Sequence, residues 1–403
     1  KLIKVYTTAS IVDDDPYLDI NTPYMSVWLD GEIGISTGRP RSLDEIKNAI
    51  QKQKDILDKE ADKYGTLADA YIAIQAGIAW NLIYEPKHNR VVSTVGRLWN
   101  EEYGGYCLFG WDNFFLSYVS ALFSKDLAYS NVIDHLDGKT QGGFIPNDNR
   151  GNGSKSFDRS QPPVGGIMVK EIYKMYPNDW FLEAAFDHLL EWNRWWQRDR
   201  VNEGLLSYGS TPADNPFNEP VFGTRTAAGY ESGMDDSPMY EGVPYNKEKK
   251  TFELQDVGLN SLYIADCKAL AEMASILGKT NEQKELTDRA ERFSSSMNKL
   301  WDNKAGIYHN YRTDLDTLSE RISPTIFYPL LADISPEPRE IRIVDYFYNS
   351  DKFYGKWMLP STARDDPSFK RQRYWKGAIW PPLNFLTYLS LRKAGHYGAS
   401  TEL

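Results

Sequence analysis

The sequence has few of the residues that build disulfide frameworks and clustered metal sites. Only two cysteines and five histidines occur among 403 residues. Cys107 and Cys267 lie in unlike surroundings and form neither a metal-binding spacing nor a disulfide framework. No apolar run approaches the roughly 18 residues that a membrane-spanning helix needs. We therefore expect no disulfide scaffold, no metal site and no membrane span.

The sequence also has fewer basic than acidic residues. The chain has 46 Lys and Arg against 56 Asp and Glu, which gives a formal net charge of -10. Binding to a polyanion requires clustered basic side chains that neutralise its phosphates. We therefore do not expect nucleic acids or anionic membranes as partners.

Aromatic residues, in contrast, are abundant, at 14% of the chain with 12 Trp and 26 Tyr. The flat C–H faces of a sugar ring pack on aromatic planes, and its hydroxyls need fixed donors and acceptors, so carbohydrate sites combine Trp, Tyr and carboxylates. A large aromatic core explains the same composition equally well. The apolar content of 41% is enough for a sizeable core in either case.

Residues 1–38 differ from the rest of the chain. Short β-branched and aromatic runs at 3–8 and 25–29 predict a few strands, and an acidic run at 13–15 separates them. A few strands are too little for an independent sheet domain. We therefore expect either an appendage packed on helices or the end of a β-domain that lies upstream.

Helical patterns dominate from Ser42 onward. Ser42 and Glu45 have the spacing of a capping box, and the apolar periodicity predicts a helix to about residue 64. Further helices are predicted over the following ranges: 67–83, 179–196, 325–332 and 381–391.

A predicted αα-hairpin lies later in the chain. Apolar residues at helical spacing run from Leu259 to Met273, and Gly278 suits the C′ position of that helix. Thr280 and Gln283 are expected to cap a second helix after a very short turn, which makes the two helices antiparallel. Repeated hairpins with long connections, and no fixed sequence period, favour a closed ring of hairpins over a solenoid.

Five segments rich in Gly, Pro, Trp and polar residues are the candidates for a functional site. We expect them to be loops before or between helices, made rigid by their Gly and Pro residues. They span residues 110–115, 142–147, 159–163, 231–238 and 374–382.

The segment 231–238 contains clustered carboxylates. Cleavage of a glycosidic bond needs a protonated carboxylic acid beside the leaving oxygen, and crowding of carboxylates raises the pKa of at least one of them. Glu231, Asp235 and Asp236 supply such a cluster, with Asp235 or Asp236 as the natural acid. Taken alone, an Asp before Ser-Pro is more typical of a turn or a helix cap.

Taken together, the segments resemble the clan of glycoside hydrolase families 63 and 37, which contains processing α-glucosidases, mannosylglycerate hydrolases and trehalases. Residues 231–235 match the clan's Glu-Ser-Gly-hydrophobic-Asp motif, and residues 159–163 match the Arg-Ser-Gln-Pro-Pro shared with trehalases. Trp111 and Asp112 match the clan's Trp-Asp. Residues 374–377 match its Tyr-Trp-Arg-Gly, with Lys376 in place of the usual Arg. The similarity is greatest to family 63.

This resemblance implies an all-α fold, an (α/α)6 six-hairpin toroid over residues 39–403, preceded by the β appendage or by the end of an upstream β-sandwich. It implies an inverting α-glycosidase acting on an α-linked glucoside or mannoside in an oligosaccharide or small glycoside. Asp235, rather than Asp236, is then the general acid. The other implied site residues bind the sugar: Trp111, Asp112, Arg159, Gln161, Glu231, Tyr374, Trp375 and Trp380.

The resemblance also places a general-base Glu some tens of residues after residues 374–377, whereas the sequence ends at Leu403. We therefore expect the base beyond Leu403 and a catalytic domain that is incomplete at its C-terminus. The alternative is a non-catalytic carbohydrate-binding toroid without a base. A sugar epimerase or polysaccharide lyase is disfavoured, because those enzymes use His or Tyr as base and none of the five segments contains His.

The expected partner is thus a carbohydrate, with no cofactor. The acidic and amide-rich stretch 148–158 offers oxygen ligands for a structural calcium ion. Its spacing is not that of an EF-hand, and we favour a solvated loop.

Overall fold

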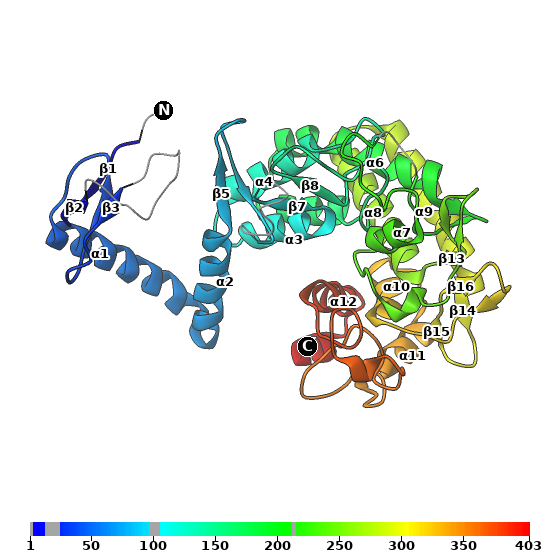
Figure 1. Cartoon of the computed structure of the whole chain (residues 1–403). Coiled ribbons are helices and arrows are strands. Elements are labelled where there is room, and N and C mark those ends of the chain that lie inside the picture. The colour runs from blue at the N-terminus through cyan, green and yellow to red at the C-terminus, as the bar shows by residue number, and fades with distance from the viewer. Residues whose placement is uncertain (1–2, 13–24, 97–104, 212–214) are drawn as a thin grey trace. The chain divides into compact units, whose positions relative to one another are not determined.

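The computed structural model describes residues 3–12, 25–96, 105–211 and 215–403. Helices dominate it, and the strands form only small sheets of two or three members (Figure 1). The chain divides into two compact units, Lys1–Gly77 and Ile78–Leu403. The domain boundary expected after residue 38 stays a prediction.

The first unit contains two antiparallel strand pairs and two helices joined by a 3-10 turn. Strand β1 (Val5–Thr7) pairs with β4 (Ile35–Thr37), and β2 (Ile11–Val12) pairs with β3 (Ser26–Val27). The turn η1 (Asp62–Leu67) links α1 (Leu43–Ala61) to α2 (Ala68–Trp80). The acidic run at 13–15 lies outside the described residues.

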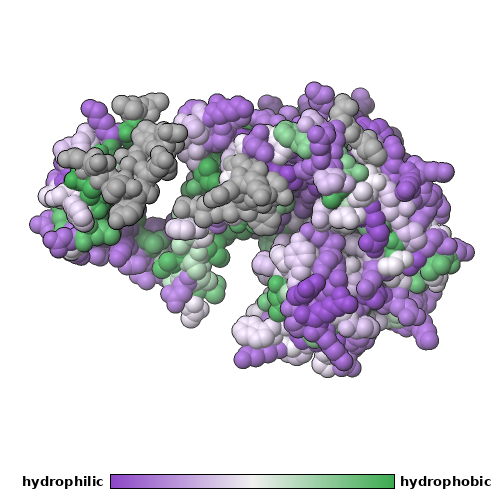
Figure 2. Space-filling view, in the orientation of Figure 1, coloured by the Kyte–Doolittle hydropathy of each residue, from purple (hydrophilic) through white to green (hydrophobic). Residues whose placement is uncertain are grey.

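The predicted capping box is confirmed at the start of α1. The Ser42 hydroxyl accepts a hydrogen bond from the Glu45 backbone N–H at 3.2 Å, and the Glu45 carboxylate accepts one from the Ser42 N–H at 2.8 Å. Beyond this start, α1 buries little of its apolar face. Ile50 and Ile56 remain exposed, and Figure 2 shows hydrophobic residues on the surface of this unit.

The second unit begins near the end of α2 and carries the remaining helices. They are α3 (Gly110–Ser120), α4 (Lys125–Asp137), α5 (Gly165–Met175), α6 (Asp179–Arg200), α7 (Arg225–Glu231), α8 (Val257–Ile276), α9 (Thr280–Ser296), α10 (Tyr328–Leu331), α11 (Glu337–Tyr348), α12 (Pro381–Lys393) and α13 (Tyr397–Glu402).

Five of these helices pack on one another in chain order. Helix α3 contacts α5, α5 contacts α8, α8 contacts α10, and α10 contacts α12. The series returns to its start through aromatic contacts, because Phe385 of α12 lies 5.6 Å from Phe115 and from Tyr118 of α3, measured between ring centroids. Helices α4, α6, α9 and α13 pack against members of this series. The count of six hairpins stays a prediction.

The helical hairpin α8–α9 confirms one turn signal and corrects another. Gly278 has a φ of +68°, and the Lys279 and Gly278 N–H groups donate to the carbonyls of Ala274 and Ser275, which is a Schellman ending. The helix α9, however, begins at Thr280 with Lys279 as its N-cap and no side-chain capping bond. The predicted capping by Thr280 and Gln283 is therefore wrong, because the Schellman turn itself already sets the entry of α9.

Much of the aromatic content belongs to the core. Trp192, Trp195 and Trp196 of α6 are all buried, and Trp192 stacks on Phe114 with ring centroids 5.7 Å apart. The composition alone was thus a weak signal for sugar binding.

Short strands tie the connections together in this unit. The pairs are β5 (Leu82–Glu85) with β6 (Arg90–Ser93), β7 (Cys107–Phe109) with β8 (Asp148–Arg150), β9 (Val201–Asn202) with β10 (Leu205–Leu206), β11 (Tyr245–Asn246) with β12 (Thr251–Phe252), and β14 (Trp301–Asp302) with β15 (Ile307–Tyr308). Strand β16 (Tyr311–Arg312) lies between β13 (Leu254–Gln255) and β17 (Thr317–Leu318). Within the described residues, no helix is long and apolar enough to cross a membrane.

Candidate active site

The predicted site residues gather where helices of the series begin. Segment 110–115 is not a loop as expected but the first turns of α3, which places Trp111 and Asp112 at the N-terminal end of this helix. Gln161 lies in the connection before α5, and Trp380 is the N-cap of α12. The Gln161 side-chain carbonyl accepts a hydrogen bond from the Trp111 N–H at 3.0 Å.

The segment 231–238 lies directly against Trp111. Gly233 has a φ of +69°, a left-handed conformation that favours glycine. A Cβ atom at this position would lie 2.7 Å from the Trp111 ring. Both the backbone conformation and the close approach therefore require glycine at position 233, two residues before Asp235.

Asp235 is partly buried beside the Tyr374 hydroxyl, which donates a hydrogen bond to its carboxylate. Burial raises the pKa of Asp235, and the negative charge of Asp236 adds to this rise. The hydrogen bond from Tyr374 and the positive charge of Arg159 act in the opposite direction on this pKa. The net direction is upward, which favours a carboxylic acid that retains its proton.

Asp112 has the second raised pKa of the site. Its side chain is partly exposed, yet protein atoms surround it closely, and desolvation raises its pKa to about 7. The negative charge of Asp235 makes a small contribution to the rise in the pKa of Asp112. The site therefore contains two carboxyl groups whose pKa values burial raises.

Aromatic rings line the same region. Trp375 is buried, its ring centroid is 6.4 Å from that of Trp111, and it stacks on Trp380 at 4.2 Å. The Trp380 indole N–H donates to the Tyr374 carbonyl at 2.6 Å. Tyr374, Trp375 and Trp380 thus form one connected aromatic group next to Asp235.

Glu231 has a different environment from the one expected. Its carboxylate is completely buried and pairs with Arg200 at 2.6 and 2.8 Å. It also accepts hydrogen bonds from the N–H groups of Ser160 at 3.0 Å and Gly209 at 2.6 Å. Protein donors occupy both oxygens, so the geometry favours a role in holding three segments together over contact with a sugar.

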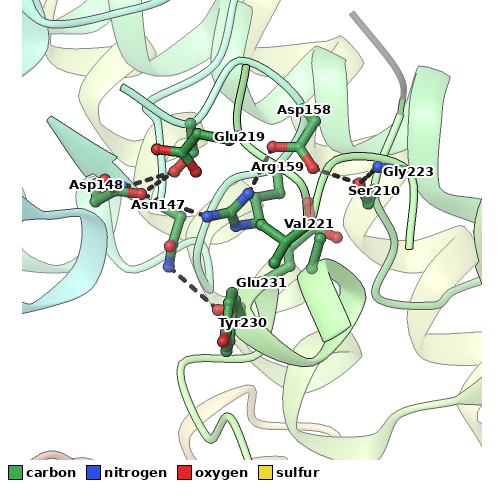
Figure 3. A network of polar contacts seen from close by, with 12 residues as sticks. Asn147, Asp148, Asp158, Arg159, Ser210, Glu219, Val221, Gly223, Tyr230 and Glu231 are labelled. Carbon is green, nitrogen blue, oxygen red and sulfur yellow. Dashed lines mark hydrogen bonds and ion pairs between the residues drawn. The ribbon is translucent and has the colours of Figure 1, made fainter. Parts of the chain in front are cut away.

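Arg159 lies in a network of charged groups (Figure 3). It pairs with Asp158 at 2.7 Å and with Asp148 at 3.5 Å, and its guanidinium carbon lies 5.4 Å from the centre of the Tyr230 ring. Its buried Nε–H has no partner among the described residues.

The same network corrects the interpretation of residues 148–158. Asp148 and Asp158, at the two ends, are buried rather than solvated. Asp148 pairs with Arg150 as well as Arg159, and Asp158 accepts a hydrogen bond from the Ser210 hydroxyl. Arginine and hydroxyl groups take the oxygens that a calcium ion would need. Within the described residues, no group of three His, Cys, Asp or Glu side chains could hold a metal ion.

A cavity of about 1390 Å³ lies elsewhere in the unit. It is lined mainly by residues of α5, α8, α9 and α12, with Lys170, Lys268 and Arg392 among them. None of the predicted site residues contributes to it. We place the candidate site at Asp235 because the raised pKa values and the aromatic rings occur there.

Comparison with known proteins identifies the family of the chain. Residues 105–403 match the family described as mannosylglycerate hydrolase MGH1-like glycoside hydrolase domain. The chain belongs to this family. The resemblance to glycoside hydrolase family 63 that the motifs predicted is thereby confirmed, and the matched range contains every predicted site residue of this MGH1-like domain.

Curated relatives of the MGH1-like domain share low identity with it. The glucosylglycerate hydrolase of Mycolicibacterium hassiacum is 23% identical over 298 residues, which cover 56% of this chain and 61% of that protein. The mannosylglycerate hydrolase of Thermus thermophilus is 23% identical over 285 residues, which cover 60% of this chain and 67% of that protein. The chain thus spans about three fifths of the length of the curated relatives it matches.

Solved structures support the fold. A family 63 mannosylglycerate hydrolase from Thermus thermophilus, solved in complex with glucose, aligns with a TM-score of 0.66 and 17% identity, over 82% of this chain and 89% of that one. Neutral trehalase of Saccharomyces cerevisiae aligns with a TM-score of 0.61 and 17% identity, over 78% of this chain and 66% of that one. The MGH1-like domain therefore shares the helical architecture of both enzymes.

Two important residues were not assigned from the sequence. Arg200, the partner of Glu231, lies near the end of a helix that shows only apolar periodicity, and no local pattern links the two residues. Asp236 was considered only as an alternative acid, yet it accepts a hydrogen bond from the Trp375 N–H at 3.0 Å and pairs with Lys376 at 3.3 Å.

Proposed function

We propose that this MGH1-like domain hydrolyses an α-linked glucoside or mannoside with inversion, and that Asp235 is the general acid. The observation that carries the proposal is the position of Asp235. Its carboxyl group lies beside a group of aromatic rings, in contact with the Tyr374 hydroxyl, and burial raises its pKa. The relatives named glucosylglycerate and mannosylglycerate hydrolases make glycosides of glyceric acid the first substrates to test.

A general acid must hold a proton and deliver it to the glycosidic oxygen. Desolvation favours the protonated carboxyl of Asp235, and Tyr374 orients one of its oxygens. Asp236, one residue later, is engaged by Trp375 and Lys376, which supports Asp235 as the residue that remains available.

The other polar groups would bind the sugar hydroxyls. Asp112 and Gln161 flank Trp111, and Arg159 has a buried Nε–H without a hydrogen-bond partner among the described residues. We infer that Asp112, Gln161 and Arg159 hold the ring that is cleaved. Trp111, Tyr374, Trp375 and Trp380 would wall it. Glu231 would act indirectly, through the segments that it joins.

The packing of α3, α5, α8, α10 and α12 in series supports an (α/α)6 toroid as the scaffold. In that arrangement, the connections at one end of the ring form a pocket from several hairpins. The site residues before and within α3, α5 and α12 fit this scheme.

The test uses the full-length protein and its Asp235→Asn variant. Aryl α-glucosides and α-mannosides with poor leaving groups require protonation, whereas α-glycosyl fluorides do not. We expect Asp235→Asn to reduce kcat by about 10² to 10⁴-fold on the aryl glycosides and far less on the fluorides. Asp288→Asn, at an exposed position on α9, is the matched control and should behave as the wild type.

Near-normal turnover of poor leaving groups by Asp235→Asn would refute the assignment of the acid. NMR of the first product tests the stereochemistry, since inversion of an α-glycoside releases the β-anomer. Release of the α-anomer contradicts inversion. Sugar binding without turnover by the wild-type protein would favour the carbohydrate-binding toroid instead.

A further inference from the structure

Asp236 joins two segments that are 139 positions apart in the sequence. Its Oδ1 atom accepts a hydrogen bond from the Trp375 backbone N–H at 3.0 Å. Its Oδ2 atom lies 3.3 Å from the Lys376 ammonium nitrogen, and 14% of the Lys376 side chain is exposed. One carboxylate therefore holds both the backbone and a charged side chain of the aromatic segment.

The aromatic segment needs such support because its backbone is strained. Tyr374 has a φ of +47°, and Gln372 has a φ of +45°. A bulky residue in this left-handed region costs on the order of 1 kcal/mol or more and persists only where neighbouring contacts impose it. Other contacts also hold the segment. They include the backbone hydrogen bonds between Arg373 and Lys376, the Trp380 N–H on the Tyr374 carbonyl and the Gly377 N–H on the Ser361 hydroxyl.

The strained conformation has a direct effect on the site. It directs the Tyr374 side chain toward Asp235, whose carboxylate accepts the hydrogen bond from the tyrosine hydroxyl. The following residue turns into the protein, where its ring packs near Trp111 and on Trp380. The two adjacent carboxylates thus make different contacts. Asp235 accepts a hydrogen bond from the Tyr374 hydroxyl, and Asp236 accepts one from the backbone N–H of Trp375.

We propose that Asp236 is a positioning residue, which fixes segment 374–376 so that the Tyr374 hydroxyl meets Asp235 and the Trp375 ring walls the sugar site. This inference rests on the proposed function with Asp235 as the acid. Asp236 itself touches no reacting atom in this scheme, and its effect on the reaction passes through Tyr374 and Trp375.

Three substitutions separate the two contacts of Asp236. Asp236→Ala removes both, Asp236→Asn keeps an acceptor for the Trp375 N–H but loses the ion pair, and Lys376→Met loses only the ion pair. Asp288→Ala, in the exposed Lys284–Asp288 pair of α9, is the matched control.

The first measurement is hydrogen exchange of the peptide that contains Trp375, which needs no substrate. We expect at least tenfold faster exchange of the Trp375 amide in Asp236→Ala, a smaller change in Asp236→Asn and in Lys376→Met, and none in the control. Unchanged exchange in Asp236→Ala overturns the proposal. If Asp236→Ala fails to fold, Asp236→Asn and Lys376→Met still test whether the ion pair holds the segment. Faster exchange of the Trp375 amide in both supports the proposal, and unchanged exchange in both overturns it.

The second measurement is a double-mutant cycle with Tyr374→Phe on an aryl glycoside. A misplaced group lowers the rate by about 100-fold. We expect this loss in Asp236→Ala, and no further loss when Tyr374→Phe is added, since the hydroxyl is already displaced. Additive losses indicate a purely structural role and overturn the proposal. An inactive wild-type protein refutes the proposed function alone, because exchange still shows whether Asp236 holds the segment.

Discussion

The buried pair Arg200–Glu231 allows a quantitative prediction. Arg200→Met keeps much of the side-chain volume but removes both hydrogen bonds from the guanidinium to the Glu231 carboxylate. Breaking a fully buried pair by removing one partner costs about 3–5 kcal/mol, because the remaining charge is uncompensated. The N–H groups of Ser160 and Gly209 still donate to Glu231, so we expect the lower end, about 3 kcal/mol.

This loss should depend on pH. Burial already raises the pKa of Glu231, and Arg200 is the largest influence that lowers it. Without Arg200 the folded-state pKa rises further above that of the unfolded chain, so stability is lost as the pH increases through the folded-state value. The deficit of Arg200→Met should therefore be larger at pH 8 than at pH 5.

Urea unfolding, followed by circular dichroism at both pH values, measures the change. Lys284→Met, in the exposed pair on α9, should leave the unfolding free energy unchanged within error. The double variant with Glu231→Leu should recover part of the stability, because no charge is then left buried. A loss below about 1 kcal/mol for Arg200→Met, or strict additivity in the double variant, would refute the reasoning.

Two further predictions concern stability and backbone conformation. Burial raises the pKa of Asp266 to about 7 and that of Asp256 to about 6. The unfolding free energy should therefore fall as the pH rises from about 4 to 8. Urea titrations at several pH values should show a flatter pH dependence for Asp266→Asn. Gly278→Ala should cost about 1 kcal/mol, because a Cβ there meets open space at positive φ. Gly233→Ala should lower the unfolding free energy more than Gly278→Ala and should also reduce hydrolysis, because its Cβ would overlap the Trp111 ring. Equal losses of stability for the two variants in thermal unfolding would contradict this prediction.

The sequence predicted helix ends correctly where the stabilising contacts are local. The capping box at Ser42 and the glycine after α8 depend only on nearby backbone groups, so a few letters of sequence were enough to predict them. The motif-bearing segments also come together, as the contacts of Trp111 with Gln161, Gly233 and Trp375 show.

The failures concern contacts that local patterns do not encode. Segment 110–115 contains Gly and Trp and was expected to be a loop, yet tertiary packing of Phe114 and Phe115 makes it a helix. The acidic ends of stretch 148–158 were expected to be solvated. Their partners Arg150 and Arg159 are close in the sequence, but the burial of the two carboxylates comes from packing between distant segments, such as the contact of Asp158 with Ser210, 52 positions away. The role of Glu231 as a sugar ligand stays a prediction. Its partner Arg200 lies 31 positions away in the sequence, so no local pattern indicated the pair.

The segment around Asp235 is held on both sides, at Glu231 by Arg200 and at Asp236 by Trp375 and Lys376. With both ends tied to separate parts of the protein, the chain between them has a fixed contour length. Related sequences should accordingly keep the number of intervening residues even where Ser232 or Met234 is replaced. An inserted or deleted residue there would shift the carboxyl group by the span of one peptide unit, about 3.8 Å.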